Sequence, residues 1–432
     1  MNPRTIVKKL IPKSLFRTIE PYGHLLEAVL FNVLYGFPAR RLKVIGVTGT
    51  NGKTSTAFLI HRMLHEAGYK VGLNTTVGWG VGADIQPQLH HMTTVAVPEL
   101  MQRLRYFKKQ KVEWLVLETT SHALAQHRVW GVPYSIAVLT NLTHEHLQYH
   151  GTFERYRDAK RMMFKMANAN KKGLRAGIIN ADDPSAEYFA SDILHPILYG
   201  VEGGAVQATD VKLTTKGVSY KTKIGDQEYS IKSQLPGSFN VYNSLAAACV
   251  GHVIGLTKEQ VEQGIAALPS VEGRMTTINE GQDFTLMVDY AHSPDSFEKL
   301  FKDIKPTVKG KLIVLFGSLG GGDKGKRPLQ GELAGQYADE VIICEEDDRQ
   351  ESPEQIMNDI AEGAEKAGKV QGKDLFLVHD RPEAMQFAVN RAKKGDIVLF
   401  LGKGHEKTIE HADGEHPWDE IATAHQVLKQ RG

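Results

Sequence analysis

The feature that most constrains the fold of this chain is the alternation, from residue 42 onward, of short apolar β-rich runs with amphipathic helical patterns. This alternation is typical of parallel sheets, because neighbouring parallel strands need a long crossover connection, usually a helix. Residues 43–47 fit a buried strand, and residues 54–68 fit a helix that ends at a capping glycine, Gly68. We therefore predict an α/β fold.

A glycine-rich segment joins that strand to that helix: Gly46-Val47-Thr48-Gly49-Thr50-Asn51-Gly52-Lys53-Thr54. Glycines allow backbone N–H groups to close around a phosphate, and the helix N-terminus adds a favourable dipole. Lys53 is placed to reach the β- and γ-phosphates, and the Thr54 hydroxyl to ligate Mg²⁺. The strict pattern has glycine in place of Val47, but the strand–loop–helix context favours phosphate binding over a structural turn. The predicted nucleotide-binding residues here are Gly49, Asn51, Gly52, Lys53, Thr54 and Ser55.

The chain is long enough for two or three domains, since 432 residues exceed the usual size of one hydrophobic core. Further strands are predicted at residues 114–117 and 136–139. Residues 205–235 are predicted to form a hairpin with a turn at 224–227. A second series of strands is predicted at residues 284–288, 312–316, 341–344, 375–378 and 397–401. We predict three parts. They are a basic and apolar segment (1–41), a central P-loop-type ATPase domain with a mostly parallel sheet (42–270), and a C-terminal Rossmann-like α/β domain (271–432).

Charge and cysteine content exclude several classes of function. Lysine and arginine number 52 against 50 acidic residues, and a net charge of +2 is too small for bulk nucleic-acid binding. The two cysteines, Cys249 and Cys344, stand inside apolar runs, so neither a disulfide framework nor a cysteine zinc site is expected. Such thiols fit a reducing, cytoplasmic compartment. We expect a monomer that acts on small molecules.

The N-terminal segment carries an apolar stretch at residues 25–35, interrupted by Glu27 and Asn32 and too short to span a membrane. It follows the basic residues Lys8, Lys9, Lys13 and Arg17. No small-residue cleavage site comes after it, which argues against a signal peptide. Two interpretations stay open: a helix packed on the next domain, which we favour, or a basic amphipathic element in peripheral contact with a membrane.

Glu118 follows a buried strand, at the edge of a parallel sheet where catalytic groups are presented. Its carboxylate would hold Mg²⁺; the alternative is a salt-bridged residue at a strand end. A histidine-rich run comes after the next strand, Thr140-Asn141-Leu142-Thr143-His144-Glu145-His146-Leu147-Gln148-Tyr149-His150-Gly151. It is followed by Tyr156-Arg157-Asp158-Ala159-Lys160.

The run from Glu118 to Lys160 resembles the Mur ligase family, and within it the members that add the third peptide residue to UDP-N-acetylmuramoyl-dipeptide. The phosphate loop and further motifs match in order over essentially residues 42–425: Asn180-Ala181-Asp182-Asp183, Gly273-Arg274-Met275, Asp289-Tyr290-Ala291-His292-Ser293-Pro294-Asp295, Asp323-Lys324-Gly325-Lys326-Arg327-Pro328 and Gly402-Lys403-Gly404-His405-Glu406. The resemblance implies an ATP-dependent ligase of cell-wall precursor synthesis. Such an enzyme activates a carboxylate as an acyl phosphate and joins it to an amine.

The resemblance also implies roles around ATP and Mg²⁺. Glu118 and His146 would ligate a Mg²⁺, and Lys160 stands where the family carries a carbamylated lysine, a further metal ligand. With Lys53, these are the predicted catalytic residues. The other ATP-binding residues by resemblance are Asn240 (with Asn243, on the adenine side), Arg274, Asp289, Lys324 and Arg327. His122 and Glu145 are the candidates for the base that deprotonates the amine.

The two organic substrates have their own implied residues. Thr93, Thr94, Ser121 and Arg128 stand where the family holds the muramoyl-peptide, and Gly402, Glu406 and Arg349 where it holds the amino acid. One motif is altered, since Glu346-Asp347-Asp348-Arg349 replaces the family's Asp-Asn-Pro-Arg. The extra negative charge would favour an amino acid with a cationic side chain.

Three alternatives stay open. Only about forty residues precede the phosphate-loop strand, where the family has a uridine-nucleotide-binding domain, so an acceptor without UDP, including a lipid-linked one, is an alternative. Another amide ligase of the superfamily, of the folylpolyglutamate, poly-γ-glutamate or cyanophycin synthetase type, is a second. A nucleotide-binding module without catalysis is the third, and retention of Glu118, His146 and Lys160 together argues against it.

Overall fold

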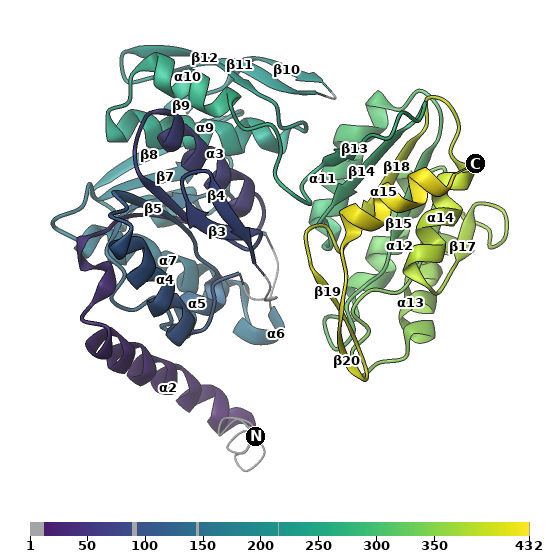
Figure 1. The fold of residues 1–432 in the computed structure, drawn as a ribbon, viewed down its shortest axis with the longest axis horizontal. Helices are drawn as coiled ribbons and strands as arrows, with labels where there is room; N and C mark the ends of the chain where they lie inside the picture. The colour runs from purple at the N-terminus through teal and green to yellow at the C-terminus, as the bar shows by residue number, and fades with distance from the viewer. Residues whose placement is uncertain (1–12, 89–92, 144–146, 215, 432) are drawn as a thin grey trace. The chain divides into compact units, whose positions relative to one another are not determined.

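The computed structural model describes residues 13–88, 93–143, 147–214 and 216–431, which fall into two compact units (Figure 1). Unit 1 consists of Met1–Lys212, Ser219–Ser233 and Asn240–Leu268. Unit 2 consists of Leu213–Val218, Gln234–Phe239 and Pro269–Gly432. The main change from one unit to the other therefore falls after Leu268, where helix α10 (Lys258–Ala266) has just ended.

The described part of unit 1 is built on a nine-stranded sheet in the order β4-β3-β2-β5-β1-β6-β7-β8-β9. Its strands are β1 (Lys43–Thr48), β2 (Val71–Asn74), β3 (Gly78–Val81), β4 (Asp84–Pro87), β5 (Trp114–Glu118), β6 (Tyr134–Leu139), β7 (Ala176–Asn180), β8 (His195–Gly200) and β9 (Val206–Gln207). The pairs β2–β3 and β3–β4 are antiparallel, and the pairs from β2 across to β9 are parallel. Strands β5, β6 and β7 are buried along their whole length, as expected when helices cover both faces. The predicted α/β fold is confirmed.

Helix α3 follows the glycine-rich loop and has a glycine at each end. It runs over Lys53–Glu66, between Gly52 and Gly68, which both have positive φ. The Gly68 N–H donates to the His65 carbonyl at 3.0 Å and the Tyr69 N–H to that of Leu64 at 3.1 Å, so Gly68 terminates the helix as predicted. Other described helices of this unit are η1 (Pro38–Arg41), α4 (Val97–Lys109), α5 (Ser121–Ala125), α6 (Leu147–His150), α7 (Phe153–Ala169), α8 (Ala186–Ala190) and, from Asn240 on, α9 (Phe239–Ile254).

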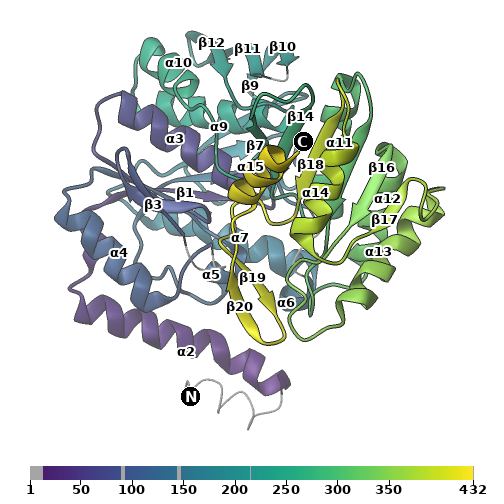
Figure 2. The ribbon, with the colours of Figure 1, turned by 45° about the vertical axis from the view of Figure 1, so that its right-hand side comes forward.

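Helix α2 (Lys13–Leu34) contains the apolar stretch of the N-terminal segment and lies beside α4 in both views (Figures 1 and 2). Ala28 and Asn32 are buried, and Asn32 Nδ2 donates to the Ala28 carbonyl at 2.9 Å and the Trp130 carbonyl at 3.0 Å. The prediction of a helix packed on the following domain is therefore confirmed for the face of α2 that contains Ala28 and Asn32. Among the described residues, no helix has both the length and the apolar character needed to cross a membrane.

A second, small sheet in the order β10-β11-β12 covers the predicted hairpin region. Its strands are β10 (Thr209–Thr214), β11 (Gly217–Ile224) and β12 (Gln227–Ser233). Gly225 and Asp226 form the turn, and Gly225 has φ of 58°, which suits a two-residue hairpin loop. The Tyr220 hydroxyl bonds with that of Ser244 at 3.0 Å, so β11 is attached to α9.

The described part of unit 2 contains a six-stranded sheet in the order β13-β14-β18-β15-β16-β17. Its strands are β13 (Thr276–Ile278), β14 (Thr285–Asp289), β15 (Leu312–Phe316), β16 (Glu340–Ile343), β17 (Leu375–Leu377) and β18 (Ile397–Leu401). The five predicted strands are confirmed to within one residue at each end. Strand β13, antiparallel to β14, and the hairpin of β19 (Thr408–His411) and β20 (Gly414–Pro417) were not predicted.

Helices cover both faces of this sheet, which explains why the sequence of strand β15 is apolar throughout. Leu312, Val314 and Phe316 pack on one face, against α11 (Pro294–Ile304), α12 (Lys326–Tyr337) and α13 (Pro353–Lys366). Ile313 and Leu315 pack on the other face, against α14 (Arg381–Arg391) and α15 (Glu420–Gln430). Alternate side chains of a strand point to opposite faces, so both sets must be apolar. The short helix η2 (Lys305–Thr307) follows α11.

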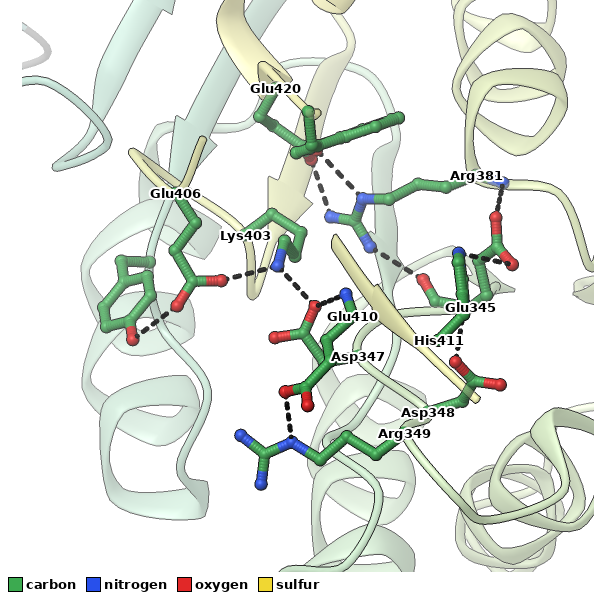
Figure 3. A network of polar contacts seen from close by, with 12 residues as sticks. Glu345, Asp347, Asp348, Arg349, Arg381, Lys403, Glu406, Glu410, His411 and Glu420 are labelled. Atoms are coloured by element: carbon green, nitrogen blue, oxygen red, sulfur yellow. Dashed lines mark hydrogen bonds and ion pairs between the residues drawn. The ribbon is translucent and has the colours of Figure 1, made fainter. Parts of the chain in front are cut away.

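A fully buried ion pair joins α14 to α15 in unit 2 (Figure 3). Arg381 Nη2 donates to Glu420 Oε1 at 2.6 Å and its Nε to Oε2 at 2.9 Å. Arg381 also donates to the Leu401 carbonyl at 2.8 Å, and the Trp418 indole N–H donates to Glu420 at 2.9 Å. Burial lowers the pKa of Arg381, but the attraction and hydrogen bonds of Glu420, together with the charges of further groups nearby, raise it above its usual value, so the guanidinium is charged.

Replacing Glu420 with glutamine is expected to lower the free energy of unfolding of unit 2 by about 3–5 kcal/mol, because it leaves a buried guanidinium without its counter-charge. Urea unfolding followed by tryptophan fluorescence measures this, because Trp418 reports on unit 2 while Trp79, Trp114 and Trp130 report on unit 1. Glu362→Gln is the matched control, because Glu362 pairs with Lys366 on the exposed surface of α13 and its loss should change stability little. Equal effects of the two substitutions would contradict the prediction.

Candidate active site

The glycine-rich loop between β1 and α3 has a backbone that requires glycine at two positions. Gly49 has φ of 150° and Gly52 has φ of 80°. A Cβ atom would lie 1.9 Å from Thr140 Oγ1 at the first position and 2.4 Å from Asn243 Oδ1 at the second. The loop can therefore lie close against its neighbours, with its N–H groups leading into the N-terminus of α3, a geometry that binds phosphate.

Residues that follow β6 hold the loop in place. The Asn51 N–H donates to Asn141 Oδ1 at 2.9 Å, and the Thr140 hydroxyl donates to the Asn51 carbonyl at 2.6 Å. The Thr50 N–H donates to the Asn141 carbonyl at 2.8 Å. The predicted nucleotide-binding residue Asn51 is thus fixed from two sides. Such a loop is preorganised for a ligand, because its conformation does not have to be ordered when the ligand binds.

Two lysine side chains donate to successive carbonyls of this loop. Lys53 Nζ lies 2.7 Å from the Thr50 oxygen, and Lys160 Nζ, from α7, lies 2.6 Å from the Gly49 oxygen. Lys160 is 2% exposed, and its Nζ lies 4.6 Å from the centroid of the Tyr156 ring. The Tyr156 hydroxyl bonds with that of Thr50 at 3.0 Å, so α7 is attached to the loop at two points. The structure therefore brings together two residues that were predicted from separate motifs.

Glu118 is buried at the end of β5 and faces the first turn of α3. The Thr54 hydroxyl donates to its Oε2 at 3.0 Å. Thr76, just after β2, donates its N–H to Oε2 at 3.1 Å and its hydroxyl to Oε1 at 3.2 Å. The carboxylate is thus held by neutral donors beside the phosphate loop, and the alternative of a salt-bridged strand-end residue loses support.

The Thr54 hydroxyl and the Glu118 carboxylate fit Mg²⁺, which prefers oxygen ligands and usually takes only one or two carboxylates from a protein while substrate phosphates and water complete its shell. Among the described residues, no group of three or more histidine, cysteine, aspartate or glutamate side chains could hold a metal ion. The predicted ligand His146 and the base candidate Glu145 lie outside the described residues. The Thr54–Glu118 pair therefore fits a metal ion that is shared with a nucleotide.

The four residues predicted for the carboxylate substrate lie around the end of β5. Thr93 accepts a hydrogen bond from the Thr76 hydroxyl at 2.8 Å, and the Thr94 hydroxyl donates to the Glu118 carbonyl at 3.2 Å. Arg128 donates to the Thr94 carbonyl, and burial lowers its pKa to about 10. The Ser121 hydroxyl, at the start of α5, bonds with His150 Nε2 at 3.0 Å. The base candidate His122 lies with its ring 4.3 Å from that of Tyr149.

Asn240 and Asn243, predicted for the adenine side, are buried on α9 and bond to each other at 2.8 Å. Asn243 Oδ1 accepts from the Thr56 hydroxyl at 3.2 Å, which connects α9 to α3 one turn after the phosphate loop. The neighbouring Ser55 is also buried. Asn243 therefore supports the loop itself, both here and through its closeness to Gly52.

Comparison with known proteins identifies the family. The model of the Mur ligase middle domain matches residues 47–251, and that of the Mur ligase glutamate ligase domain matches residues 273–404. The UDP-N-acetylmuramyl-tripeptide synthetase of Roseiflexus sp. (strain RS-1) is 40% identical over 424 residues, which cover 95% of this chain and 83% of that protein. This chain belongs to the Mur ligase family. It is an ATP-dependent ligase, as the resemblance of its motifs implied.

Solved structures agree with this assignment. A UDP-N-acetylmuramoyl-L-alanyl-D-glutamate–2,6-diaminopimelate ligase is 29% identical with a TM-score of 0.64, over 95% of this Mur ligase and 83% of that chain. The MurF ligase of Thermotoga maritima, solved with ADP, is 20% identical with a TM-score of 0.67, over 94% of this chain and 84% of that one. At 20% identity, the similarity to the MurF ligase shows a shared fold.

Unit 2 of this Mur ligase contains the other residues predicted to reach ATP. The Arg274 guanidinium lies 4.6 Å from the centroid of the Tyr290 ring. Asp289 accepts the N–H groups of Met275 at 2.7 Å and Ala291 at 2.8 Å. Burial raises the pKa of Asp289, and the charge of Arg274 acts in the opposite direction.

Lys324 and Arg327 make ion pairs inside unit 2. Arg327 is fully buried and donates to Glu351 at 2.8 Å and to Asp359 at 2.9 Å. Lys324 lies 2.5 Å from the same Glu351. Hydrogen bonds from Arg327 and then Lys324 hold the pKa of Glu351 well below its usual range. Arg327 thus connects α12 to α13, and Lys324 pairs with a carboxylate just before α13. The role of both cations in binding ATP stays a prediction.

Three charged residues of the altered motif before α13 make ion pairs or hydrogen bonds within unit 2 (Figure 3). The fully buried Lys403 lies 2.7 Å from Asp347 and 2.6 Å from Glu406. Asp348 lies 2.5 Å from His411, and Arg349 donates to Glu410 at 2.9 Å. Asp347 and Asp348 therefore both have partners within the unit, and the expectation of a cationic amino acid stays a prediction.

The loop that contains Gly402, His405 and Glu406 lies in the same region of unit 2. The Tyr290 hydroxyl donates to Glu406 at 3.1 Å, which fixes a carboxylate predicted to hold the amino acid. Burial lowers the pKa of His405 to about 3, so this histidine is neutral near pH 7. Gly402 lies against Glu346, whose Oε2 would be 2.3 Å from a Cβ atom at that position. Glu346 is itself buried, and burial raises its pKa.

Thr76 is a site residue that the sequence did not point to. It makes two hydrogen bonds to Glu118 and one to Thr93, so it connects the predicted metal ligand to the predicted acceptor site. The available signal was its place in Asn74-Thr75-Thr76, directly after an apolar strand. Polar residues that follow parallel strands gather at one edge of the sheet.

Proposed function

We propose that this Mur ligase joins an amino acid to the carboxylate of a muramoyl-dipeptide-type acceptor, in the synthesis of cell-wall precursors. The relative from Roseiflexus is named a tripeptide synthetase, and a solved relative is named a diaminopimelate ligase. The observation that carries the proposal is the convergence of Lys53, Lys160 and the Thr54–Glu118 pair on one phosphate loop. This arrangement suits transfer of a γ-phosphoryl group to an acid held beside it.

The reaction we propose has two steps. The acceptor carboxylate attacks the γ-phosphorus of ATP, which forms an acyl phosphate and releases ADP. The amine of the amino acid then attacks the acyl carbon, and inorganic phosphate leaves. Lys53 and the N–H groups of the loop would stabilise the charge that spreads over the phosphoryl oxygens in the first step.

Thr54 and Glu118 would hold Mg²⁺, together with His146 and a carbamylated Lys160. When bound, the metal ion neutralises negative charge on the phosphates. Thr76 would fix the Glu118 carboxylate through both of its hydrogen bonds. His122 and Glu145 stay the candidates for the base that takes a proton from the amine.

The acceptor would lie near Thr93, Thr94, Ser121 and Arg128. Arg128 suits a carboxylate or phosphate because its guanidinium presents a planar set of donors. Its donation to the Thr94 carbonyl fixes the side chain in this region. Action in the cytoplasm and as a monomer stay predictions from the sequence.

Inorganic phosphate release measured with purified enzyme, ATP and Mg²⁺ tests the proposal. Release should require both an acceptor and an amino acid, and mass spectrometry should find the two joined. A panel of muramoyl-dipeptide acceptors with and without UDP, beside folate and glutamate acceptors, identifies the substrate class. Turnover of folate or polyglutamate acceptors alone would overturn the proposed function in favour of another superfamily ligase.

Glu118→Gln is expected to lower turnover by about 100-fold or more and to raise the Mg²⁺ concentration needed for half-maximal rate. Glutamine can still accept hydrogen bonds from Thr54 and Thr76, so the loss of turnover would result from the missing negative charge of Glu118. Phosphate release titrated with Mg²⁺ measures both quantities. Glu113→Gln is the control, since Glu113 is exposed just before the same strand. An unchanged Mg²⁺ requirement in Glu118→Gln would contradict the metal-binding role.

A further inference from the structure

Helix α2 has a second face that nothing in the described part of unit 1 covers. The exposed fractions on it are 66% for Tyr22, 71% for Leu26, 55% for Leu30, 58% for Val33 and 66% for Leu34. Successive spacings of four, four and three residues from Tyr22 to Val33 place these side chains on one side of a helix. Five of the eleven exposed large hydrophobic side chains of the described residues lie on this one helix, so they form a stripe and are not scattered.

The stripe is about 18 Å long, at 1.5 Å per residue from Tyr22 to Leu34. It stands opposite the face that packs on unit 1, where Ala28 and Asn32 are buried. Figures 1 and 2 both show α2 at the edge of unit 1, with α4 on one side of it. The exposed face therefore belongs to a helix that unit 1 holds in place.

Cationic side chains lie near the C-terminal end of the stripe. Arg40 and Arg41, in η1, are exposed, and the Arg40 guanidinium lies 3.8 Å from the centroid of the Phe37 ring. Arg105 of α4 is exposed as well and lies 5.8 Å from the Tyr35 ring. No acidic residue occurs in the sequence between Glu27 and Arg41.

The sequence before the stripe is also basic. Residues 1–19 contain Arg4, Lys8, Lys9, Lys13 and Arg17 and no acidic residue. The acidic residues of α2 are Glu20, just before the stripe, and Glu27, and both lie beside His24, at 3.9 Å and 3.6 Å. Positive charge thus precedes and follows an exposed apolar face.

We propose that α2 attaches this Mur ligase to the surface of an anionic lipid bilayer. Leu26, Leu30 and Val33 enter the boundary between headgroups and acyl chains, and the flanking cations contact the acidic headgroups. An extended anionic surface matches cations at both ends of the stripe better than a small acidic patch on a protein does. The helix lies on the surface, because no described helix is long and apolar enough to cross a bilayer.

Flotation of the full chain with vesicles tests this proposal. Wild-type protein should float with vesicles of phosphatidylcholine and phosphatidylglycerol at low salt, and much less with phosphatidylcholine alone or at high salt. The double variant Leu26→Glu/Leu30→Glu should lose about tenfold or more of the binding to anionic vesicles. Both side chains are more than half exposed, so the fold should tolerate the change, and circular dichroism verifies it.

The matched control is Leu194→Glu/Val370→Glu, which adds the same charge at two sites that are each 52% exposed and lie outside α2. This control should bind anionic vesicles like the wild type. Equal binding by the two double variants, or no flotation of the wild type, would overturn the proposal. So would a concentration-dependent dimer in sedimentation that Leu26→Glu/Leu30→Glu abolishes without any vesicle binding, because a second copy would then cover the stripe. Phosphate release with a soluble acceptor should be the same in all three proteins, which separates this test from that of the ligase reaction.

Discussion

Replacing Lys53 with alanine is expected to abolish ATP turnover while unit 1 stays folded. Lys53 begins α3 and its ammonium group lies at the mouth of the phosphate loop, 2.7 Å from the Thr50 carbonyl. A positive charge placed there would stabilise the transferred phosphoryl group. Loss of one such charge costs roughly a thousandfold in rate or more.

Phosphate release under saturating ATP measures the effect of Lys53→Ala, and nucleotide binding by calorimetry shows whether the ground state is affected too. Lys70→Ala is the control, because Lys70 is exposed in the loop after α3. Thermal unfolding should be similar for the two variants and the wild type. Near-normal turnover in Lys53→Ala would reject the phosphate-binding role of the loop.

Replacing Lys160 with alanine is expected to lower turnover by about 100-fold or more, and short carboxylates such as acetate should restore part of it. Carbamylation converts the ammonium group to an anion, which suits a position beside metal ions. A small acid that enters the vacated space would supply that negative charge again. Phosphate release measured over a range of acetate concentrations tests this expectation.

The structure also offers a simpler role for Lys160, as an ammonium group that holds the Gly49 carbonyl at 2.6 Å. The two roles predict different behaviour. If the ammonium group matters, Lys160→Arg should keep much of the activity and acetate should restore nothing to Lys160→Ala. If the carbamate matters, Lys160→Arg should be as inactive as Lys160→Ala. Wild-type rates in Lys160→Ala would contradict both roles.

Local sequence patterns were sufficient to predict the α/β fold class and several of the buried strands of this chain. Strand β15 was predicted from an apolar run alone, because a parallel strand covered on both faces has no polar position. Helix α3 was predicted from its spacing and from Gly68, which ends it. The edge strand β13 was missed because it is three residues long and only partly buried.

Contacts between distant parts of the sequence could not be predicted in the same way. Lys160 meets the phosphate loop although 111 positions separate it from Gly49, and only the fold brings them together. Arg327 was predicted for the ATP side by resemblance to the family, yet it is fully buried and bonded to Glu351 and Asp359. The charge of a residue is read from the sequence, but its partner is set by packing.

The most direct test of the ligase chemistry is to follow oxygen from the acceptor. An acceptor carboxylate labelled with oxygen-18 is incubated with the enzyme, ATP and the amino acid, and the inorganic phosphate is analysed by mass spectrometry. Formation and aminolysis of an acyl phosphate predict that each phosphate released carries one labelled oxygen. Unlabelled phosphate, or label recovered in AMP, would contradict an acyl phosphate intermediate.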